Sequence, residues 1–321
     1  MDFKAANSAT GGGQAWLPVV PSPGLVPGPA IAHRAQPPLS GPVVTPRTLT
    51  APTILVFDSG LGGLTVFREV AQARPDARLI YAADDAVFPY GRLAEAALIS
   101  RVVAVMERLI AANDPDLVVV ACNTASTLVL PTLRARFAVP FVGTVPAIKP
   151  ACAASSTKLV SVLGTEATVK REYTHALIRE FAAGCEVTLV GSARLAAFAE
   201  SELRGEAVAD AAIADEMAPC FVSNGTGRTD TVVLACTHYP LLLQRLERLA
   251  PWPVAFLDPA PAIARRVREL VGPGNGGEPA WPAHAIFTSH RAVSPALAAA
   301  LGRFGIGKIA AGGFDTSAVS A

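Results

Sequence analysis

Short apolar runs alternate with stretches of helical spacing through most of the chain, and this alternation constrains the fold most strongly. Ile54–Phe57, Leu79–Ala82 and Leu117–Ala121 are short and apolar, as buried strands are. Leu64–Arg74 and Ala94–Ala112, which separate them, carry apolar residues on one helical face. Strands that alternate with helices form parallel sheets joined by crossover connections, so the sequence predicts an α/β fold.

The same alternation begins again in the second half of the chain. Further strands are expected at Lys158–Leu163, Val187–Val190, Thr231–Ala235, Val254–Leu257 and Ala285–Thr288. Further helices are expected at Thr127–Phe137, Thr168–Ala183, Leu203–Met217, Pro261–Val271 and Pro295–Phe304, with a polar loop at Ser223–Thr229. The restart predicts two related lobes, the first formed by residues 52–146 plus 256–321 and the second by 147–255.

Residues 1–51 differ from the rest of the chain. They hold Gly11-Gly12-Gly13 and then frequent prolines, a composition that neither sustains a helix nor pairs in a sheet. We expect a disordered Pro/Gly-rich extension. A start codon assigned too far upstream is an equally good explanation of this segment.

Composition narrows the class of partner. Net charge is +1 and no basic stripe is evident, which argues against nucleic acid and favours a small-molecule substrate. The five cysteines show no CxxC spacing, so neither a disulfide framework nor a structural zinc site is predicted. No apolar run approaches the roughly 20 residues that span a bilayer, and no secretory signal is evident. A cytoplasmic protein without a membrane partner is expected.

Two strands end in the same way, 114 positions apart. One apolar run leads into Ala121-Cys122-Asn123-Thr124 and the other into Ala235-Cys236-Thr237-His238. Two thiols that face each other across a cleft could act as acid and base on opposite faces of one substrate. A cysteine can equally be a small buried apolar residue, which is the better interpretation of Cys152, Cys185 and Cys220.

Polar residues follow several of the expected strands, where parallel sheets bind their ligands. Asn123, Thr124 and Thr237 would offer a carboxylate amide and hydroxyl groups beside helix N–H groups, or would simply cap those helices. Thr165 and Thr168 follow a strand of the second half. Together these residues predict a site for a small anionic molecule between the two halves.

Three further features have a functional and a structural interpretation. Asp58 opens a glycine-rich turn that lacks the third glycine of a dinucleotide loop, and its charge would repel a pyrophosphate. It is better explained as an acid/base aid or as a partner for a substrate ammonium. His238 could relay a proton beside Cys236 or could be a packed or capping histidine. Tyr90, in the turn Pro89-Tyr90-Gly91, could close the cleft or cover a core.

Six motifs together resemble bacterial glutamate racemase, of the aspartate/glutamate racemase family. They are FDSGLGGLTV, PYG, ACNTAS, GTVPAIKPA, LGT and ACTHYPLL, spread over Phe57 to Leu242. The resemblance implies two pseudo-symmetric α/β lobes, each a mainly parallel sheet flanked by helices, with the active site in the cleft between them. It also implies an enzyme without metal or cofactor that interconverts L- and D-glutamate and supplies D-glutamate for peptidoglycan. A homodimer is expected on the same ground.

The resemblance also assigns roles to residues of this sequence. Cys122 is implied as the base toward D-glutamate and Cys236 as the base toward L-glutamate. Asp58 and His238 would assist the first and the second thiol, and Glu200 matches a glutamate near the second. Positions that match substrate contacts are Ser59, Pro89, Tyr90, Gly91, Asn123, Thr124, Thr165, Thr168 and Thr237.

The sequence departs from the family at two places and leaves other functions open. Ala83-Asp84-Asp85 stands where a threonine often follows the aspartate, and Arg171 stands where a serine is common. A racemase for aspartate or another acidic amino acid, or a non-catalytic amino-acid-binding protein, remains an alternative. A cysteine hydrolase is less favoured because Cys236 and His238 have no clear third partner. Since no lysine stands in an evident Schiff-base context, we expect direct deprotonation of the substrate.

Overall fold

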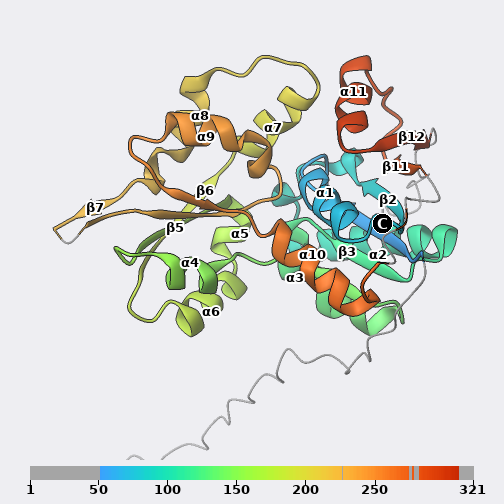
Figure 1. Ribbon diagram of the computed structural model, residues 1–321, viewed down its shortest axis with the longest axis horizontal. Helices are drawn as coiled ribbons and strands as arrows, with labels where there is room; N and C mark the ends of the chain where they lie inside the picture. The colour runs from blue at the N-terminus through green and yellow to red at the C-terminus, as the bar shows by residue number, and fades with distance from the viewer. Residues whose placement is uncertain (1–50, 226, 275–276, 278–281, 311–321) are drawn as a thin grey trace, which may run out of the picture. The chain divides into compact units, whose positions relative to one another are not determined.

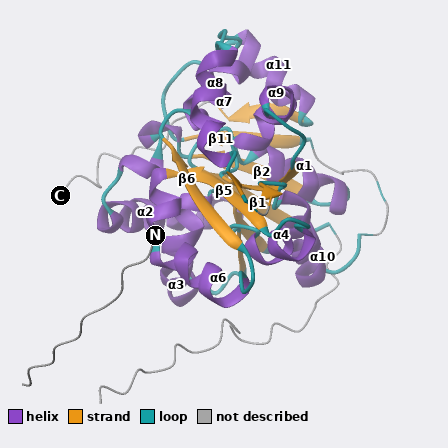
Figure 2. Ribbon diagram, turned by 90° about the vertical axis from the view of Figure 1, so that its left-hand side faces the viewer, coloured by secondary structure: helices purple, strands orange, loops and turns teal. Residues whose placement is uncertain are grey.

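The computed structural model describes residues 51–310 apart from 226, 275–276 and 278–281 (Figure 1). The expected N-terminal extension therefore lies outside the described residues, except for residue 51. The described part contains two parallel sheets with helices on both faces, as predicted (Figure 2). No helix of this part is both long and apolar enough to cross a bilayer.

The first sheet has six strands in the order β12-β11-β2-β1-β3-β4, all paired in parallel. They are β1 (Thr53–Asp58), β2 (Arg78–Ala83), β3 (Leu117–Val120), β4 (Phe141–Gly143), β11 (Ala283–Phe287) and β12 (Ile306–Ala310). Its helices are α1 (Leu64–Ala73), α2 (Glu95–Asn113), α3 (Asn123–Arg136), α10 (Ala260–Val271) and α11 (Pro295–Arg303).

Both faces of this sheet are buried, which explains why its strands are continuous apolar runs. Ile54 and Val56 of β1 pack in one core with residues of α1, α10 and α11. Leu55 and Phe57 point to the other face, into a core shared with α2 and α3. Because successive side chains alternate across a strand, β1 contributes to both cores.

The second sheet has four parallel strands in the order β10-β9-β5-β6. They are β5 (Leu159–Thr165), β6 (Glu186–Ser192), β9 (Thr231–Ala235) and β10 (Ala255–Leu257). Its helices are α4 (Ile148–Ala154), α5 (Glu166–Lys170), α6 (Glu172–Phe181), α7 (Leu195–Leu203), α8 (Asp210–Met217) and α9 (Leu243–Leu249).

The repeat inferred from the sequence is visible in the topology. In the first sheet β1 lies between β2 and β3, and in the second sheet β5 lies between β6 and β9. Asp58 ends β1 and Thr165 ends β5, so the two turn residues occupy equivalent positions. Cys122 follows β3 and Cys236 follows β9, which makes the two cysteine positions equivalent as well.

Several predicted elements were wrong in detail. The helix expected at Leu203–Met217 is the end of α7 followed by α8, because the chain turns at Gly205 with a positive φ of 83°. The helix expected at Thr168–Ala183 is broken between α5 and α6, where Arg171 has extended backbone. The polar loop at Ser223–Thr229 contains a short antiparallel hairpin, β7 (Ser223–Asn224) with β8 (Gly227–Arg228).

The predicted lobe boundary at residues 255–256 falls within a strand. β10 begins at Ala255 and pairs with β9, so the second sheet continues to Leu257. The expected strand Ala285–Thr288 begins earlier, as β11 at Ala283. β4, α4, α9 and β12 were not predicted.

Candidate active site

The two equivalent cysteines line one small cavity. The cavity has a volume of about 20 Å³, roughly the space of one water molecule. Its lining residues come from the carboxyl ends of strands in both sheets, where ligands bind in parallel α/β folds. They are Ser59, Phe88, Pro89, Tyr90, Gly91, Cys122, Asn123, Thr124, Thr165, Ala196, Cys236, Thr237 and His238.

Cys122 is the N-cap of α3, and its nearest polar partner is a hydroxyl group. Its Sγ lies 3.5 Å from Ser59 Oγ. Burial, followed by the negative charge of Asp58, raises the pKa of the Cys122 thiol to about 12. Burial thus outweighs the contacts that favour a thiolate here, the hydrogen bonds with Ser59 and with the backbone of Ala125.

Asp58 lies behind this thiol and does not line the cavity. Its carboxylate is fully buried, accepts a hydrogen bond from the Gly60 N–H at 3.0 Å, and accepts another from the Thr237 hydroxyl at 3.2 Å. Burial raises the pKa of Asp58, against the lowering effect of the charge on His238. A carboxyl group with a raised pKa is better suited to exchange protons near neutral pH.

Cys236 has an imidazole as its partner. Its Sγ lies 3.8 Å from Nδ1 of His238, and Nε2 of the same ring lies 3.0 Å from Oε1 of Glu200. Burial acts to lower the pKa of His238, but the contacts with Cys236 and Glu200 outweigh it and raise that pKa well above its usual value. Burial acts to raise the pKa of Glu200, yet the contact with His238 leaves it lowered. The pair therefore favours an imidazolium next to a carboxylate.

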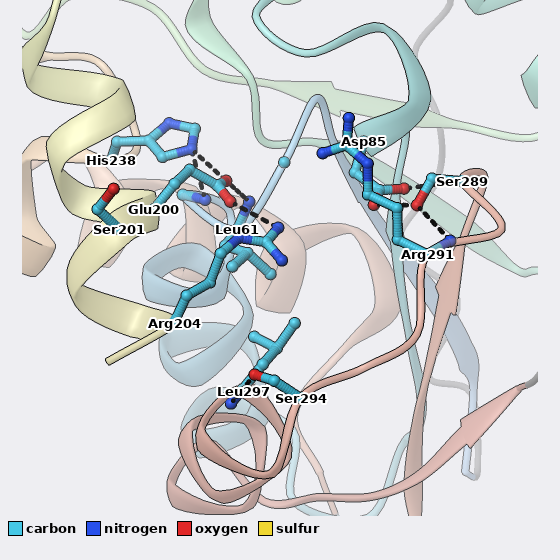
Figure 3. Close-up of polar contacts among 12 residues, drawn as sticks. Leu61, Asp85, Glu200, Ser201, Arg204, His238, Ser289, Arg291, Ser294 and Leu297 are labelled. Atoms are coloured by element: carbon cyan, nitrogen blue, oxygen red, sulfur yellow. Dashed lines mark hydrogen bonds and ion pairs between the residues drawn. The ribbon is translucent and has the colours of Figure 1, made fainter. Parts of the chain in front are cut away.

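The glycine-rich turn after β1 holds these two side chains. The Gly62 N–H lies 3.1 Å from Nε2 of His238, and the Leu61 N–H donates to Oε1 of Glu200 at 2.5 Å (Figure 3). When the ring is neutral, Nε2 can accept from Gly62; when it is protonated, Nε2–H can donate to Glu200. The turn thus supports both protonation states of the imidazole.

The turn has no room for side chains at its glycines. A Cβ at Gly62 would lie 2.4 Å from Nδ1 of His238, and one at Gly60 would lie 2.4 Å from Oε1 of Glu200. Close approach of a backbone to its partner is a common reason for glycine. The glycines thus allow the turn to approach the side chains of the second half.

Asn123 has a polar group that the protein leaves without a partner. Its side chain is 2% exposed, it lines the cavity, and neither its amide nitrogen nor its oxygen has a hydrogen-bond partner. A buried amide in this state costs free energy unless a ligand satisfies it. This makes Asn123 the clearest candidate for a substrate contact.

Three threonine hydroxyls meet beside Asn123. Thr124 Oγ1 lies 3.0 Å from Thr165 Oγ1 and 3.3 Å from Thr168 Oγ1, and the latter two are 2.9 Å apart. Thr165 is also the N-cap of α5, since its hydroxyl accepts from the Thr168 N–H. Thr168 is fully buried and does not line the cavity. The cluster joins α3, on the first sheet, to α5, on the second.

Tyr90 lines the cavity with its ring, while its hydroxyl points elsewhere. That hydroxyl donates to Asp84 at 2.6 Å, and the same buried carboxylate binds Arg101 and the Thr288 hydroxyl. Asp84 belongs to the stretch Ala83-Asp84-Asp85, where the sequence departs from the family. It thus anchors the turn that carries Pro89, Tyr90 and Gly91.

The structure brings the predicted site residues together in two layers. Asp58, Glu200 and Thr168 lie behind the cavity, and the other predicted residues line it. Phe88 and Ala196 line it as well and were not predicted. Phe88 precedes the PYG motif and stacks near His238, with ring centroids 5.3 Å apart, so the motif could have been extended by one residue. Within the described residues, no group of three or more His, Cys, Asp or Glu could hold a metal ion.

Comparison with known proteins agrees with this geometry. The sequence model of the family described as Asp/Glu/Hydantoin racemase matches residues 61–267. A glutamate racemase of Brucella anthropi is 57% identical over 226 residues, 70% of this chain and 81% of its own. One of Brucella ovis is 58% identical over 219 residues, 68% of this chain and 79% of its own.

A solved structure supports the same relationship. The Escherichia coli glutamate racemase, in complex with L-glutamate and the activator UDP-MurNAc-ala, has a TM-score of 0.74 and 41% sequence identity. The match covers 82% of this chain and 97% of that one. The chain therefore belongs to the Asp/Glu/hydantoin racemase family, and the two-lobed racemase fold expected from the sequence is confirmed. It is an isomerase, and its named relatives are glutamate racemases.

Proposed function

We propose that this protein interconverts L- and D-glutamate by direct proton transfer between Cys122 and Cys236. The observation that carries the proposal is the pair of thiols lining one enclosed cavity from equivalent positions of two related sheets. Relatives named as glutamate racemases, at 57–58% identity, support glutamate as the substrate. The unsatisfied Asn123 amide in the same cavity supports a polar ligand there.

Substrate binding prepares the reaction. Asn123 and Ser59 supply side-chain hydrogen-bond donors for the carboxylates of glutamate, Thr237 lines the cavity beside them, and the N-terminus of α3 adds a positive field. The substrate ammonium brings a positive charge into the buried site. A nearby cation favours the thiolate form. Substrate binding therefore lowers the pKa of the Cys122 thiol, which burial raises.

Each turnover then moves two protons. With L-glutamate, the Cys236 thiolate removes the proton from Cα, and the negative charge is shared with the α-carboxylate. The Cys122 thiol donates its proton to the opposite face of Cα and becomes a thiolate. D-Glutamate leaves an enzyme whose thiol and thiolate have exchanged places, and the reverse reaction begins from that form.

The helpers differ between the two steps. His238, held by Glu200, stabilises the Cys236 thiolate and can move a proton to or from it. Asp58 and Ser59 act on the Cys122 side. These groups are buried, which strengthens the charge interactions between them.

The test is exchange of the α-hydrogen in D₂O, followed by NMR with each enantiomer of glutamate. The wild type is expected to racemise and to exchange both. Cys122→Ser and Cys236→Ser are each expected to lose racemisation, while the remaining thiol exchanges the α-hydrogen of one enantiomer without inversion. Full racemisation by either single variant would overturn the two-thiol mechanism.

The same assay separates the alternative functions. Faster racemisation of aspartate than of glutamate would make the protein a racemase for the shorter acid. Glutamate binding without exchange in the wild type would make it a binding protein. Equal exchange by a Cys220→Ser control and the wild type is expected, because Cys220 does not line the cavity.

We further propose that the product supplies peptidoglycan synthesis in the cytoplasm and that the enzyme is a homodimer. Growth of a depleted strain should then require D-glutamate, and L-glutamate should not replace it. Light scattering on the purified protein should give twice the chain mass of 33.1 kDa. Growth without D-glutamate, or the mass of a monomer, would contradict the corresponding proposal.

A further inference from the structure

The two carboxylate oxygens of Glu200 contact different partners, one in the active site and the other a cation outside it. Oε1 accepts from the Leu61 N–H at 2.5 Å and lies 3.0 Å from Nε2 of His238. Oε2 pairs with Nη2 of Arg204 at 3.2 Å (Figure 3). The Glu200 side chain is 9% exposed, so these contacts replace most of its water.

Arg204 stands where the active-site helix α7 ends. It is the C-cap of α7, and its backbone N–H donates to the carbonyls of Glu200 and Ser201. Its side chain is 26% exposed and reaches back one turn to Glu200. Residues four apart lie on one helical face, so the guanidinium covers the outer side of the carboxylate.

We infer that Arg204 is a positioning residue for the Cys236 half of the reaction. Its guanidinium holds the outer oxygen of Glu200, which keeps the inner oxygen on the His238 ring that faces Cys236. The inference rests on the proposed function, since it acts through His238 on the thiol at Cys236. Arg204 itself does not line the cavity.

The charged groups around Glu200 explain why its contact with Arg204 is important. Asp58 faces the His238–Glu200 pair from the end of β1, and Cys236 faces it from the end of β9; both are acidic groups. Glu202, on the other side of α7, pairs with Arg245. Arg204 is the cation whose contact with Glu200 offsets the repulsion between these buried acids.

The test compares Arg204→Gln with Arg204→Lys across the pH dependence of kcat/KM. Loss of a cation raises the pKa of every neighbouring acid, so the acid limb should move to higher pH in Arg204→Gln, by about half a pH unit because the side chain is partly exposed. At pH values below that limb, kcat/KM should fall roughly threefold. Arg204→Lys should keep the wild-type limb, because it retains the charge.

Arg194→Gln is the matched control. Arg194 precedes the same helix and pairs with Glu216, without a contact to Glu200. This variant should keep the wild-type limb. A uniform fall in kcat/KM with an unmoved limb in Arg204→Gln would overturn the inference and leave Arg204 a structural cap.

The test of Arg204 can fail independently of the test of the two-thiol proposal. If Cys236→Ser racemises fully, the proposed function fails, whatever Arg204→Gln does. If Cys236→Ser is inactive and Arg204→Gln keeps the wild-type limb, only the positioning role of Arg204 fails. Circular dichroism confirms in each case that the variant has folded.

Discussion

The two thiols occupy equivalent positions in the fold but have different surroundings. Cys122 contacts the Ser59 hydroxyl, and the acid behind it, Asp58, is buried and accepts hydrogen bonds from Gly60 and Thr237. Cys236 contacts an imidazole, which is backed by Glu200. The repeat therefore preserves the positions of the thiols and not their helpers.

This difference sets the distribution of charge around the two thiols. Burial and Asp58 raise the pKa of Cys122 to about 12, so the first thiol keeps its proton. Positive charge is favoured at His238, beside the second thiol. The two faces therefore differ in charge: a protonated thiol lies on the first and an imidazolium lies beside the thiol of the second.

Apart from the loss of a thiol, the largest expected effect comes from removing one helper at a time. Enantiomers have equal free energy in water, so kcat/KM must fall equally in both directions. We expect His238→Asn and Asp58→Asn each to lower it roughly 100-fold, as loss of acid/base assistance does. The difference between the faces should appear in the isotope effects on the α-hydrogen.

His238→Asn slows the transfer at Cys236, so α-deuterated L-glutamate should show a large isotope effect and α-deuterated D-glutamate a small one. Asp58→Asn should show the reverse. The measurement is the initial rate with each deuterated enantiomer. Equal isotope effects for both enantiomers in both variants would mean that the two faces share their helpers.

A smaller effect is expected from filling the turn that holds the second face. Gly62→Ala places a Cβ where His238 stands, so the ring must move away from Cys236. A displacement of this size should lower kcat/KM roughly 30-fold, with the isotope pattern of His238→Asn. Gly302→Ala is the matched control, because a Cβ there meets nothing within 4 Å.

The glycine turn also shows how far the sequence could be interpreted. The strand–helix alternation predicted the sheets, and the paired cysteines predicted the cavity, since both depend on local patterns. The sequence could not predict the contacts of Leu61 with Glu200 and of Gly62 with His238. These partners lie 139 and 176 positions away along the chain. The turn resembled a nucleotide loop in composition, but its partners in the structure are side chains.

Arg204 and Asp84 illustrate the same limit. Arg204 matters only because α7 ends there, and the sequence predicted a helix that began at Leu203 instead. Asp84 is a single buried carboxylate that joins Arg101 of α2, Tyr90 of the PYG turn and Thr288, which follows β11. Periodicity identifies helices and strands, but it does not tell which buried polar groups meet across them.

A contact shared by both faces should weaken binding without distinguishing the enantiomers. Asn123→Ala removes a buried amide that has no hydrogen-bond partner within the protein. We expect the KM for both enantiomers to rise roughly tenfold, the usual cost of one buried hydrogen bond to a charged group. Steady-state kinetics with both substrates checks this. A rise for one enantiomer alone would assign Asn123 to one face.

The smallest expected effect is on stability, and it has opposite signs at the two faces. The folded-state pKa of Asp58 is raised above 3.8, so its contribution is present below that value and is lost as pH rises through the folded pKa. The folded-state pKa of Glu200 is lowered below 4.5, so its contribution is present above that value and is lost as pH falls through the folded pKa.

At neutral pH, Asp58→Asn should therefore raise the melting temperature and Glu200→Gln should lower it, each by about 2–4 °C. Thermal unfolding followed by circular dichroism measures both. The gap between the two variants should narrow as pH approaches 4, because both carboxyl groups then become protonated in the unfolded chain. Shifts of the same sign at neutral pH would mean that the two buried acids have similar surroundings, and the contrast between the faces would then lie in the thiols alone.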